Sequence, residues 1–321
     1  MRNVLVMADS GKEYFAKSEE MLLAEGIQTV YGNPLKVEES ELIEQAAGAQ
    51  TVIAGSERWT RKVLENCKDL KLLVRCGTGY DGIDVEAASE LGIMVANTPG
   101  LNTYAVAEMA LTMMLCLQRK VKTYDRLMRA GKWGGIPVRE LREKTVGLIG
   151  FGGIAKQLAG LLQPFSCRII AYDVYQDKEA AARLGVEFVE LDEVFSEADV
   201  ISMHLPLLNS TRHMINEESL SKMKPNCILI NTSRGGIIDT KALKTALEEG
   251  KIAGAGLDVH EEEPIPEDYE MFSPENVILS PHVASFTEET TVTMIRHSAQ
   301  EIVNYYRAGE PENLINRDYR K

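Results

Sequence analysis

The stretch VGLIGFGGIAKQLAGLL, residues 146–162, decides the fold of this chain because it joins an apolar strand to a helix through a glycine-rich turn. Gly150 permits the tight turn, and Gly152 lets the backbone approach a pyrophosphate at the positive N-terminus of the helix. Ala155 stands where a third glycine is usual, and it is still small enough for close packing of helix on strand. The stretch therefore predicts a dinucleotide-binding unit.

A carboxylate at the end of the next apolar run indicates which dinucleotide is preferred. Asp173 ends the run 168–173, roughly 20 residues after Gly152, as in other dinucleotide-binding folds. A carboxylate there accepts hydrogen bonds from the ribose hydroxyls and repels a 2′-phosphate. Residues 174–176 are Val, Tyr and Gln, so no basic side chain follows directly. We expect NAD rather than NADP.

Short apolar runs alternate with helix-like stretches along almost the whole chain, which is typical of parallel sheets covered by helices. The strand candidates fall into two series, at 3–8, 50–55, 71–76 and 93–97, and then at 145–150, 168–173, 198–203, 226–231, 253–258 and 276–280. We predict an α/β fold with two doubly wound parallel-sheet domains. They are a Rossmann NAD-binding domain (99–287) and a smaller, flavodoxin-like substrate domain made of residues 1–98 and 288–321.

One long helix is expected to join the two series, starting near Asn102, which is a plausible N-cap. Apolar residues recur at helical spacing on one side, and Leu111 and Leu115 face elsewhere, so the helix is apolar nearly all round. Such a helix is buried on more than one side. Packing within one chain and a homodimer interface explain this equally well, and a homodimer is the assembly we expect.

Composition limits the remaining possibilities. The chain has 321 residues, 45% hydrophobic and 26% charged, which suits a two-domain globular protein. A net charge of −13 disfavours binding to nucleic acid or to an anionic membrane. No apolar run is long enough for a signal peptide or a membrane span, so we expect a cytoplasmic protein. The five cysteines form no CxxC pair, so neither a disulfide framework nor a metal site is expected.

Two side chains stand just beyond strand candidates, where ligands bind in open parallel sheets. His282 follows the run 276–280, ahead of Ser285-x-x-Glu288, which resembles a helix capping box. Arg234 follows the run 226–231, and two glycines after it let the chain turn. Taken alone, either residue could equally belong to a surface salt bridge.

The remaining histidines and an acidic run are less decisive. LDVHEEEPIP, residues 257–266, is either a solvated loop or a loop in which one glutamate has a buried partner. His204, at the end of the run 198–203, is expected to line the adenine side of the cleft. His213 and His297 are expected to be structural or solvated.

Seven stretches, in this order, resemble the D-isomer-specific 2-hydroxyacid dehydrogenases over essentially the full length. Within that family the chain is most similar to the phosphoglycerate dehydrogenases and their relatives. The stretches are RCGTGYDGID (75–84), NTPGLNTYAVAE (97–108), VGLIGFGGIA (146–155), HLPLLNSTRHMI (204–215), INTSRGGIID (230–239), GAGLDVHEEEP (254–264) and SPHVAS (280–285).

The resemblance implies an NAD-dependent oxidoreductase that acts on a small 2-hydroxy or 2-keto acid. His282 would be the acid/base, Glu263 its partner, and Arg234 the group that binds the substrate carboxylate and polarises the carbonyl. Glu261 and Glu262 would then be the solvated part of the acidic run. The residue types suit the reaction, because a histidine kept protonated by a carboxylate can deliver a proton to the carbonyl oxygen while hydride arrives from the nicotinamide.

The resemblance also implies the binding residues. Backbone amides around Cys76, Gly77, Thr78 and Gly79 would meet the substrate carboxylate, and Asp258 would hold the nicotinamide carboxamide. The cofactor-binding set is Thr78, Gly150, Gly152, Gly153, Ile154, Asp173, His204, Pro206, Thr232, Ser233, Asp258 and Ala284.

The chain departs from the phosphoglycerate dehydrogenases in one loop. Those enzymes place basic side chains after the second strand candidate, where this chain reads SERWT (56–60), with Glu57 beside Arg58. This favours glyoxylate or hydroxypyruvate over a phosphorylated substrate, with 3-phosphoglycerate dehydrogenase as the alternative. No regulatory domain is expected to follow, and His260 stands where an aromatic residue is more usual. An alternative of another class is an NAD-sensing, corepressor-like binding protein on the same scaffold.

Overall fold

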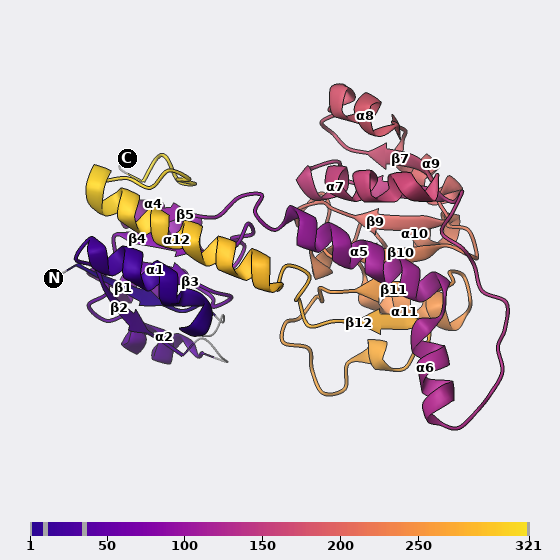
Figure 1. Cartoon of the computed structure of the whole chain (residues 1–321), viewed down its shortest axis with the longest axis horizontal. Coiled ribbons are helices and arrows are strands. Elements are labelled where there is room, and N and C mark those ends of the chain that lie inside the picture. Colours follow the sequence, from indigo (N-terminus) through magenta and orange to yellow (C-terminus); the bar gives the residue numbers. More distant parts are fainter. Residues whose placement is uncertain (1, 9–11, 34–36, 320–321) are drawn as a thin grey trace. The chain divides into compact units, whose positions relative to one another are not determined.

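A computed structural model describes residues 2–8, 12–33 and 37–319 (Figure 1). The chain forms two compact units, residues 1–102 with 286–321, and residues 103–285. Each unit is built on one sheet whose strands all run parallel. The predicted α/β class with two doubly wound parallel sheets is confirmed.

The first unit has a five-stranded sheet in the order β2-β1-β3-β4-β5, the strand order of flavodoxin-like folds. Its strands are β1 (Asn3–Val6), β2 (Gln28–Tyr31), β3 (Thr51–Ala54), β4 (Leu72–Arg75) and β5 (Met94–Ala96). Its helices are α1 (Lys12–Ala24), α2 (Glu39–Gln45), α3 (Arg61–Asn66), α4 (Val85–Glu90) and α12 (Glu288–Ala308). Figure 1 shows α12, at the end of the chain, lying beside α1 on the same sheet.

The second unit has a seven-stranded sheet in the order β12-β11-β10-β9-β6-β7-β8. Its strands are β6 (Thr145–Ile149), β7 (Arg168–Tyr172), β8 (Val186–Phe188), β9 (Val200–Met203), β10 (Ile228–Asn231), β11 (Gly254–Leu257) and β12 (Val277–Leu279). The chain order reverses between β6 and β9, and ligands bind at the carboxyl ends of strands at such a switch point. Gly150 and His204 directly follow these two strands.

Helices cover both faces of this second sheet. They are α5 (Thr103–Gln118), α6 (Val121–Arg129), α7 (Gly153–Leu162), α8 (Lys178–Leu184), α9 (Leu191–Glu197), α10 (Glu217–Lys222) and α11 (Thr240–Glu248), with short 3₁₀ turns at Gln163–Phe165, Gly235–Ile237 and Glu270–Phe272. The long apolar helix α5 packs on α7, β10 and β11. Ala107, Ala110 and Met113 are fully buried, whereas Leu111 and Leu115 are only half-buried.

Three local predictions were wrong or incomplete. The strands β2 and β8 were missed, because both are short, partly exposed edge strands that contain polar residues, so no continuous apolar run marks them. The capping box predicted at Ser285 is not the cap of α12. Thr287 is the N-cap, and its side chain accepts a hydrogen bond from the Thr290 N–H.

Within the described part of the chain, no helix is both long and apolar enough to cross a membrane.

Candidate active site

The glycine-rich turn between β6 and α7 has the backbone geometry that the sequence predicts for phosphate binding. Gly150 has φ of 94°, and a Cβ there would lie 2.8 Å from the carbonyl carbon and oxygen of His204. Gly152, the N-cap of α7, lies beside open space, since a Cβ there would meet nothing within 4 Å. A phosphate could therefore approach the N–H groups of the first turn of α7, which begins at Gly153.

Asp173 is fixed beside this turn by two backbone N–H groups. Its Oδ2 accepts from Phe151 at 2.6 Å, and its Oδ1 accepts from Tyr175 at 2.9 Å. These bonds hold the carboxylate at the glycine-rich turn, and each oxygen has a further lone pair to offer. The nearby cation Lys156 is paired with Asp177 at 2.5 Å. Asp173 is therefore placed to accept from ribose hydroxyls beside the phosphate-binding turn.

Buried polar atoms without partners lie at the carboxyl ends of β9 and β10. Within the described residues, the hydroxyls of Ser202 and Thr232 and both ring nitrogens of His204 have no hydrogen-bond partner. Part of His204 is exposed, but its ring nitrogens are buried, and this burial lowers the pKa of His204 to about 4. Unpaired buried polar groups are costly and rare in proteins. Together with the open glycine turn, they fit a polar ligand such as a dinucleotide.

The loop that carries Arg234 is held by Asn231, the last residue of β10. The Asn231 Oδ1 accepts from the N–H and the hydroxyl of Ser233, at 3.0 and 2.9 Å, and its Nδ2 donates to the Arg234 carbonyl at 2.9 Å. Asn231 is fully buried. Gly235 then packs on the His260 backbone so closely that a Cβ would lie 1.9 Å from the His260 carbonyl carbon. The position of the Arg234 backbone is therefore set from both sides.

The side chains of Glu263 and His282 lie in hydrogen-bond contact, the pairing that the family resemblance implies. The His282 Nδ1 and the Glu263 Oε2 are 2.7 Å apart, and the other oxygen of Glu263 accepts from the His260 N–H at 2.8 Å. Burial by itself would raise the pKa of Glu263. The hydrogen bond and charge of His282 and the His260 N–H outweigh it, so the net pKa of Glu263 is lowered. The carboxylate is therefore charged at neutral pH.

Asp258 anchors the turn that presents His282. Its carboxylate is fully buried and accepts from the Ser280 hydroxyl, the Val283 N–H and the Ala284 N–H at 2.6, 2.9 and 2.8 Å. His282 has φ of 57°, a left-handed conformation that is uncommon for residues other than glycine. Its own N–H donates to the Asp258 carbonyl at 2.7 Å. The predicted contact of Asp258 with a nicotinamide carboxamide stays a prediction.

The three glutamates of the acidic run have different surroundings. Glu261 is exposed, as predicted, but its carboxylate is also hydrogen-bonded. Its Oε1 lies 2.6 Å from the Nε2 of His213, and its Oε2 accepts from the Thr240 N–H at 3.1 Å. Glu262 is exposed and has no side-chain hydrogen bond or ion pair to any described residue. The run therefore contains two paired glutamates and one solvated glutamate.

In the first unit, the loop after β4 offers backbone donors. The N–H groups of Cys76 and Gly77 donate to Ala54 and Arg75, both at 2.9 Å. Thr78 is held by Asn97, whose Nδ2 donates to the Thr78 carbonyl at 2.7 Å. No hydrogen bond from the N–H of Thr78 or of Gly79 to a described residue is found. The predicted contact of the amides around Cys76, Gly77, Thr78 and Gly79 with a substrate carboxylate stays a prediction.

Charges of both signs act on this loop. Burial raises the pKa of the Cys76 thiol, the Arg75 charge lowers it, and the Glu57 charge raises it. Glu57 is buried, and its Oε2 accepts from the Gly55 N–H at 2.9 Å, whereas Arg58 is exposed. Arg75 also donates to the Cys76 carbonyl. The buried Glu57, in the loop after β3, therefore acts electrostatically on the loop after β4.

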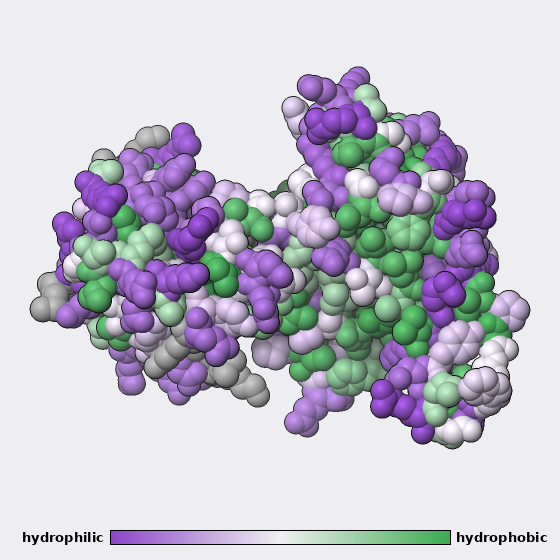
Figure 2. Space-filling model, in the orientation of Figure 1, coloured by the Kyte–Doolittle hydropathy of each residue, from purple (hydrophilic) through white to green (hydrophobic). Residues whose placement is uncertain are grey.

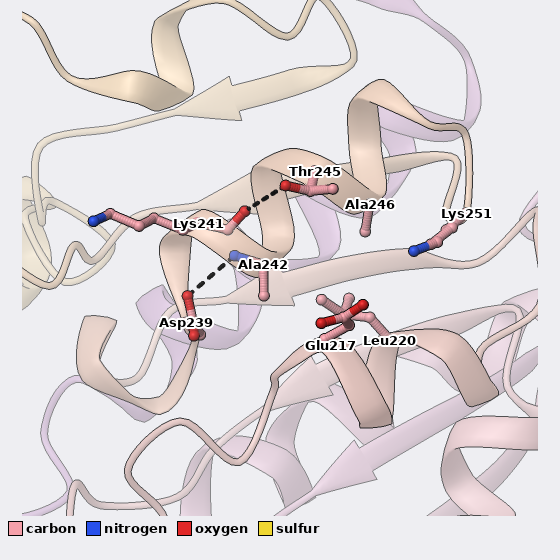
Figure 3. Close-up of a pocket in the computed structure, with 8 residues that line it drawn as sticks. All are labelled: Glu217, Leu220, Asp239, Lys241, Ala242, Thr245, Ala246 and Lys251. Atoms are coloured by element: carbon pink, nitrogen blue, oxygen red, sulfur yellow. Dashed lines mark hydrogen bonds between the residues drawn. The ribbon is translucent and has the colours of Figure 1, made fainter.

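Two other kinds of site are separate from these loops or lacking among the described residues. Among the described residues, no group of three or more His, Cys, Asp or Glu side chains could hold a metal ion. A hollow of about 330 Å³ is lined by residues of α10 and α11 and by Asp239 and Lys251. Figure 3 draws these side chains. None of the candidate site residues lines it. The candidate active site of the second unit is therefore the set of loops at the carboxyl ends of its strands.

The remaining predicted residues lie on the same loops. Ile154 is in the first turn of α7, Pro206 follows β9, and Ala284 donates to Asp258. The sequence interpretation missed the supporting role of Asn231 and the central position of His260. A signal was present for Asn231, since it is a polar residue that ends an otherwise apolar strand.

Comparison with known proteins agrees with this geometry. The NAD-binding domain of the D-isomer specific 2-hydroxyacid dehydrogenases matches residues 111–284, more than half of the chain. The chain belongs to this family. The matched residues lie in the second unit, which is therefore the NAD-binding domain of the family.

The similar proteins include glyoxylate reductases and D-3-phosphoglycerate dehydrogenases. The chain is 41% identical over 272 residues to a glyoxylate reductase of Thermococcus litoralis, covering 82% of each protein. It is 40% identical over 280 residues to a D-3-phosphoglycerate dehydrogenase of Methanocaldococcus jannaschii, covering 86% of this chain and 53% of the relative. A crystal structure of a glyoxylate reductase from Paecilomyes thermophila superimposes with a TM-score of 0.86 at 29% identity, covering 98% of each chain.

Proposed function

We propose that this protein is an NAD-dependent reductase of a small, unphosphorylated 2-keto acid such as glyoxylate or hydroxypyruvate. The observation that carries the proposal is the 2.7 Å contact between Glu263 and His282, on loops that pack beside the Arg234 loop. The same residues would catalyse the reverse oxidation of the 2-hydroxy acid.

The cofactor supplies or accepts the hydride when it is bound. Residues of the second unit would hold it. Gly150, Gly152 and the first turn of α7 would take the pyrophosphate, and Asp173 the ribose. The unpaired polar atoms of His204 and Thr232 offer further hydrogen bonds. Ile154, Pro206, Ser233, Asp258 and Ala284 complete the proposed set in this unit, and Thr78 would join it from the first unit.

His282 would deliver the proton. Its Nδ1 is held by Glu263, so Nε2 is the atom that gives a proton to the carbonyl oxygen during reduction and takes it back during oxidation. The charged Glu263 stabilises the protonated imidazole. Asp258 keeps the turn of His282 in place, since three donors of residues 280–284 converge on its carboxylate.

Arg234 would bind the substrate carboxylate and stabilise the oxygen that becomes negative. A guanidinium presents two parallel N–H groups, which match a carboxylate. For the first unit, the proposal is that backbone amides around Cys76, Gly77, Thr78 and Gly79 bind a substrate carboxylate. In the proposed reaction, His282 therefore supplies the proton, and Arg234 and backbone N–H groups bind the substrate carboxylate.

The proposed substrate class rests on the charges in the loop after β3. A phosphorylated substrate brings nearly two further negative charges, and offsetting their desolvation needs several basic groups. Glu57 is negative and buried there, and Arg58 beside it is exposed. The named activity of the Thermococcus relative points the same way. 3-Phosphoglycerate dehydrogenase is the second candidate, supported by the Methanocaldococcus relative.

The test is NADH oxidation in a panel of glyoxylate, hydroxypyruvate, phosphohydroxypyruvate, pyruvate and branched 2-keto acids. We expect the highest kcat/KM with glyoxylate or hydroxypyruvate. If phosphohydroxypyruvate is the best substrate, the second candidate is correct. If no 2-keto acid is reduced while NADH still binds, the protein is better explained as an NAD-sensing binding protein.

We further propose a homodimer. Apolar side chains are exposed on α6 and on the segment that follows it, including Val121, Met128, Ile136 and Trp133, which is 92% exposed. Figure 2 shows hydrophobic residues gathered over the face along α5. Exposed apolar patches of this kind typically mark protein interfaces. In sedimentation velocity, the parent should sediment as a dimer, and Trp133→Asp should contain a larger fraction of monomer.

The expected compartment is the cytoplasm. All five cysteines are unpaired thiols, which is usual in a reducing compartment. The proposed reaction also draws on free NADH. Fractionation of the producing cells should place the activity in the cytoplasmic fraction.

A further inference from the structure

His260 lies where the loops of the three proposed catalytic residues meet. Its carbonyl packs against Gly235, the residue after Arg234. Its N–H donates to Glu263, and its ring bonds the carbonyl of Ser280, two residues before His282. His260 therefore contacts all three loops, one through its backbone carbonyl, one through its backbone N–H and one through its ring.

The ring of His260 is held at both nitrogens. Its Nε2 lies 2.9 Å from the Ser280 carbonyl oxygen, and its Nδ1 lies 3.1 Å from the Tyr269 hydroxyl. The rings of His260 and Tyr269 pack edge to face with centroids 5.3 Å apart, and the residues are 7% and 9% exposed. Such burial and double anchoring restrict the ring to one orientation.

The hydrogen bonds define the tautomer of the neutral ring. A carbonyl oxygen only accepts, so Nε2 carries the proton and donates to Ser280. Nδ1 is then an acceptor, and the Tyr269 hydroxyl donates to it. Burial raises the pKa of Tyr269 to about 12, so this hydroxyl keeps its proton at neutral pH. In the hydrogen-bond series from Tyr269 through His260 to Ser280, each donor therefore has an acceptor.

We propose that His260 is a positioning residue for the Glu263–His282 pair, an inference that rests on the proposed function. It acts in two ways. Its N–H occupies one oxygen of Glu263, which leaves the other to face His282. Its ring ties the carbonyl of Ser280 to the acidic run, which fixes the distance between the strand end before His282 and the loop that carries Glu263.

Three variants separate this role from simple packing. His260→Phe keeps a flat ring against Tyr269 but removes both ring hydrogen bonds. His260→Gln can restore a donor near the position of Nε2, and so the bond to Ser280. Tyr269→Phe is the matched control, because it removes the Nδ1 bond and leaves the Ser280 bond in place.

We expect His260→Phe to lower kcat with glyoxylate by about 10-fold, because a small misplacement of a catalytic pair is costly. The KM for glyoxylate and the NADH dissociation constant, measured by fluorescence, should change by less than about 2-fold. His260→Gln should recover most of the loss, and Tyr269→Phe should cost less than about 3-fold. A purely structural role would instead lower the melting temperature of all three variants and leave the kcat of the folded protein unchanged.

A crystal structure of His260→Phe gives a readout that needs no turnover. We expect Glu263 and His282 to separate beyond about 3.5 Å, outside hydrogen-bonding range. If the pair keeps its 2.7 Å contact and kcat stays within 2-fold of the parent, His260 does not position it. If the parent reduces no 2-keto acid, the proposed function fails, and the distance alone decides the inference. Should His260→Phe not fold, His260→Leu, which also lacks both ring hydrogen bonds, takes its place, and a kcat within 2-fold of the parent would overturn the inference.

Discussion

The loops at the carboxyl ends of the strands carry different chemistry in the two units. In the second unit they hold the hydrogen-bonded pair Glu263–His282, and a turn with a left-handed residue that a buried Asp258 keeps in place. In the first unit the loop after β4 offers backbone N–H groups, with the opposed charges of Glu57 and Arg75 acting on it. We infer that the second unit sets the rate of the reaction and the first unit selects the substrate. Substitutions in the second unit should then slow all substrates alike, and substitutions in the first should change their order.

The largest effect is expected for Arg234→Lys in the second unit. Lysine keeps the charge but loses the planar pair of N–H groups, so it is a poor replacement at a bidentate site. We expect a loss of ~2–4 kcal/mol in transition-state stabilisation, seen in both KM and kcat for every substrate of the panel. Steady-state kinetics test it. A variant within a few-fold of the parent would place the substrate carboxylate elsewhere.

Glu263→Gln should have the next largest effect and should change the pH dependence. The amide cannot stabilise a protonated imidazole, so reductive activity should decline on the alkaline side at a pH ~1–2 units lower than in the parent. NADH binding should be nearly unchanged. Glu262→Gln is the matched control, since Glu262 is exposed in the same run. Identical pH–rate profiles for the two variants would mean that Glu263 has no special role.

The same pair makes a prediction about stability. The pKa of Glu263 is lowered in the folded protein, so its contribution to stability is present above the ordinary glutamate pKa. It is lost as the pH falls through the lowered folded value. The melting temperature of Glu263→Gln should therefore differ from the parent most at neutral pH and converge with it in acid, which melting curves between these limits would show.

Cofactor choice tests the second unit in another way. Asp173 is held at the glycine-rich turn, where a 2′-phosphate would meet its charge. NAD should be preferred over NADP by at least ~10-fold, about 1.4 kcal/mol, and Asp173→Ser should narrow this preference. Glu179→Gln is the control, because it removes one negative charge from an exposed side chain in the first turn of α8, six residues after Asp173. Equal use of both cofactors by the parent would contradict the role of Asp173.

The sequence predicted those parts of the molecule in which a local pattern decides the structure. The central strands are continuous apolar runs, and the turn at Gly150 needs a residue without a side chain, so both are visible in the sequence. The edge strand β2 is half-exposed and alternating, and was missed. His260 and Glu261 owe their roles to partners far along the chain, Ser280 and Thr240, which no local pattern shows.

The smallest effects should come from the first unit, and they should fall on substrate choice. Glu57 is buried in the loop after β3 and its charge reaches Cys76, so Glu57→Gln should ease the entry of a further negative charge. We expect it to raise kcat/KM for phosphohydroxypyruvate relative to glyoxylate by ~5-fold, on the order of 1 kcal/mol for a charge at this range. Arg58→Ala, at an exposed neighbour, should leave the ratio within ~2-fold, because exposed charges are screened. The ratio of the two kcat/KM values, measured for parent and both variants, is the readout. If phosphohydroxypyruvate is the best substrate of the parent and Arg58→Ala abolishes that preference, the first unit binds phosphate through Arg58.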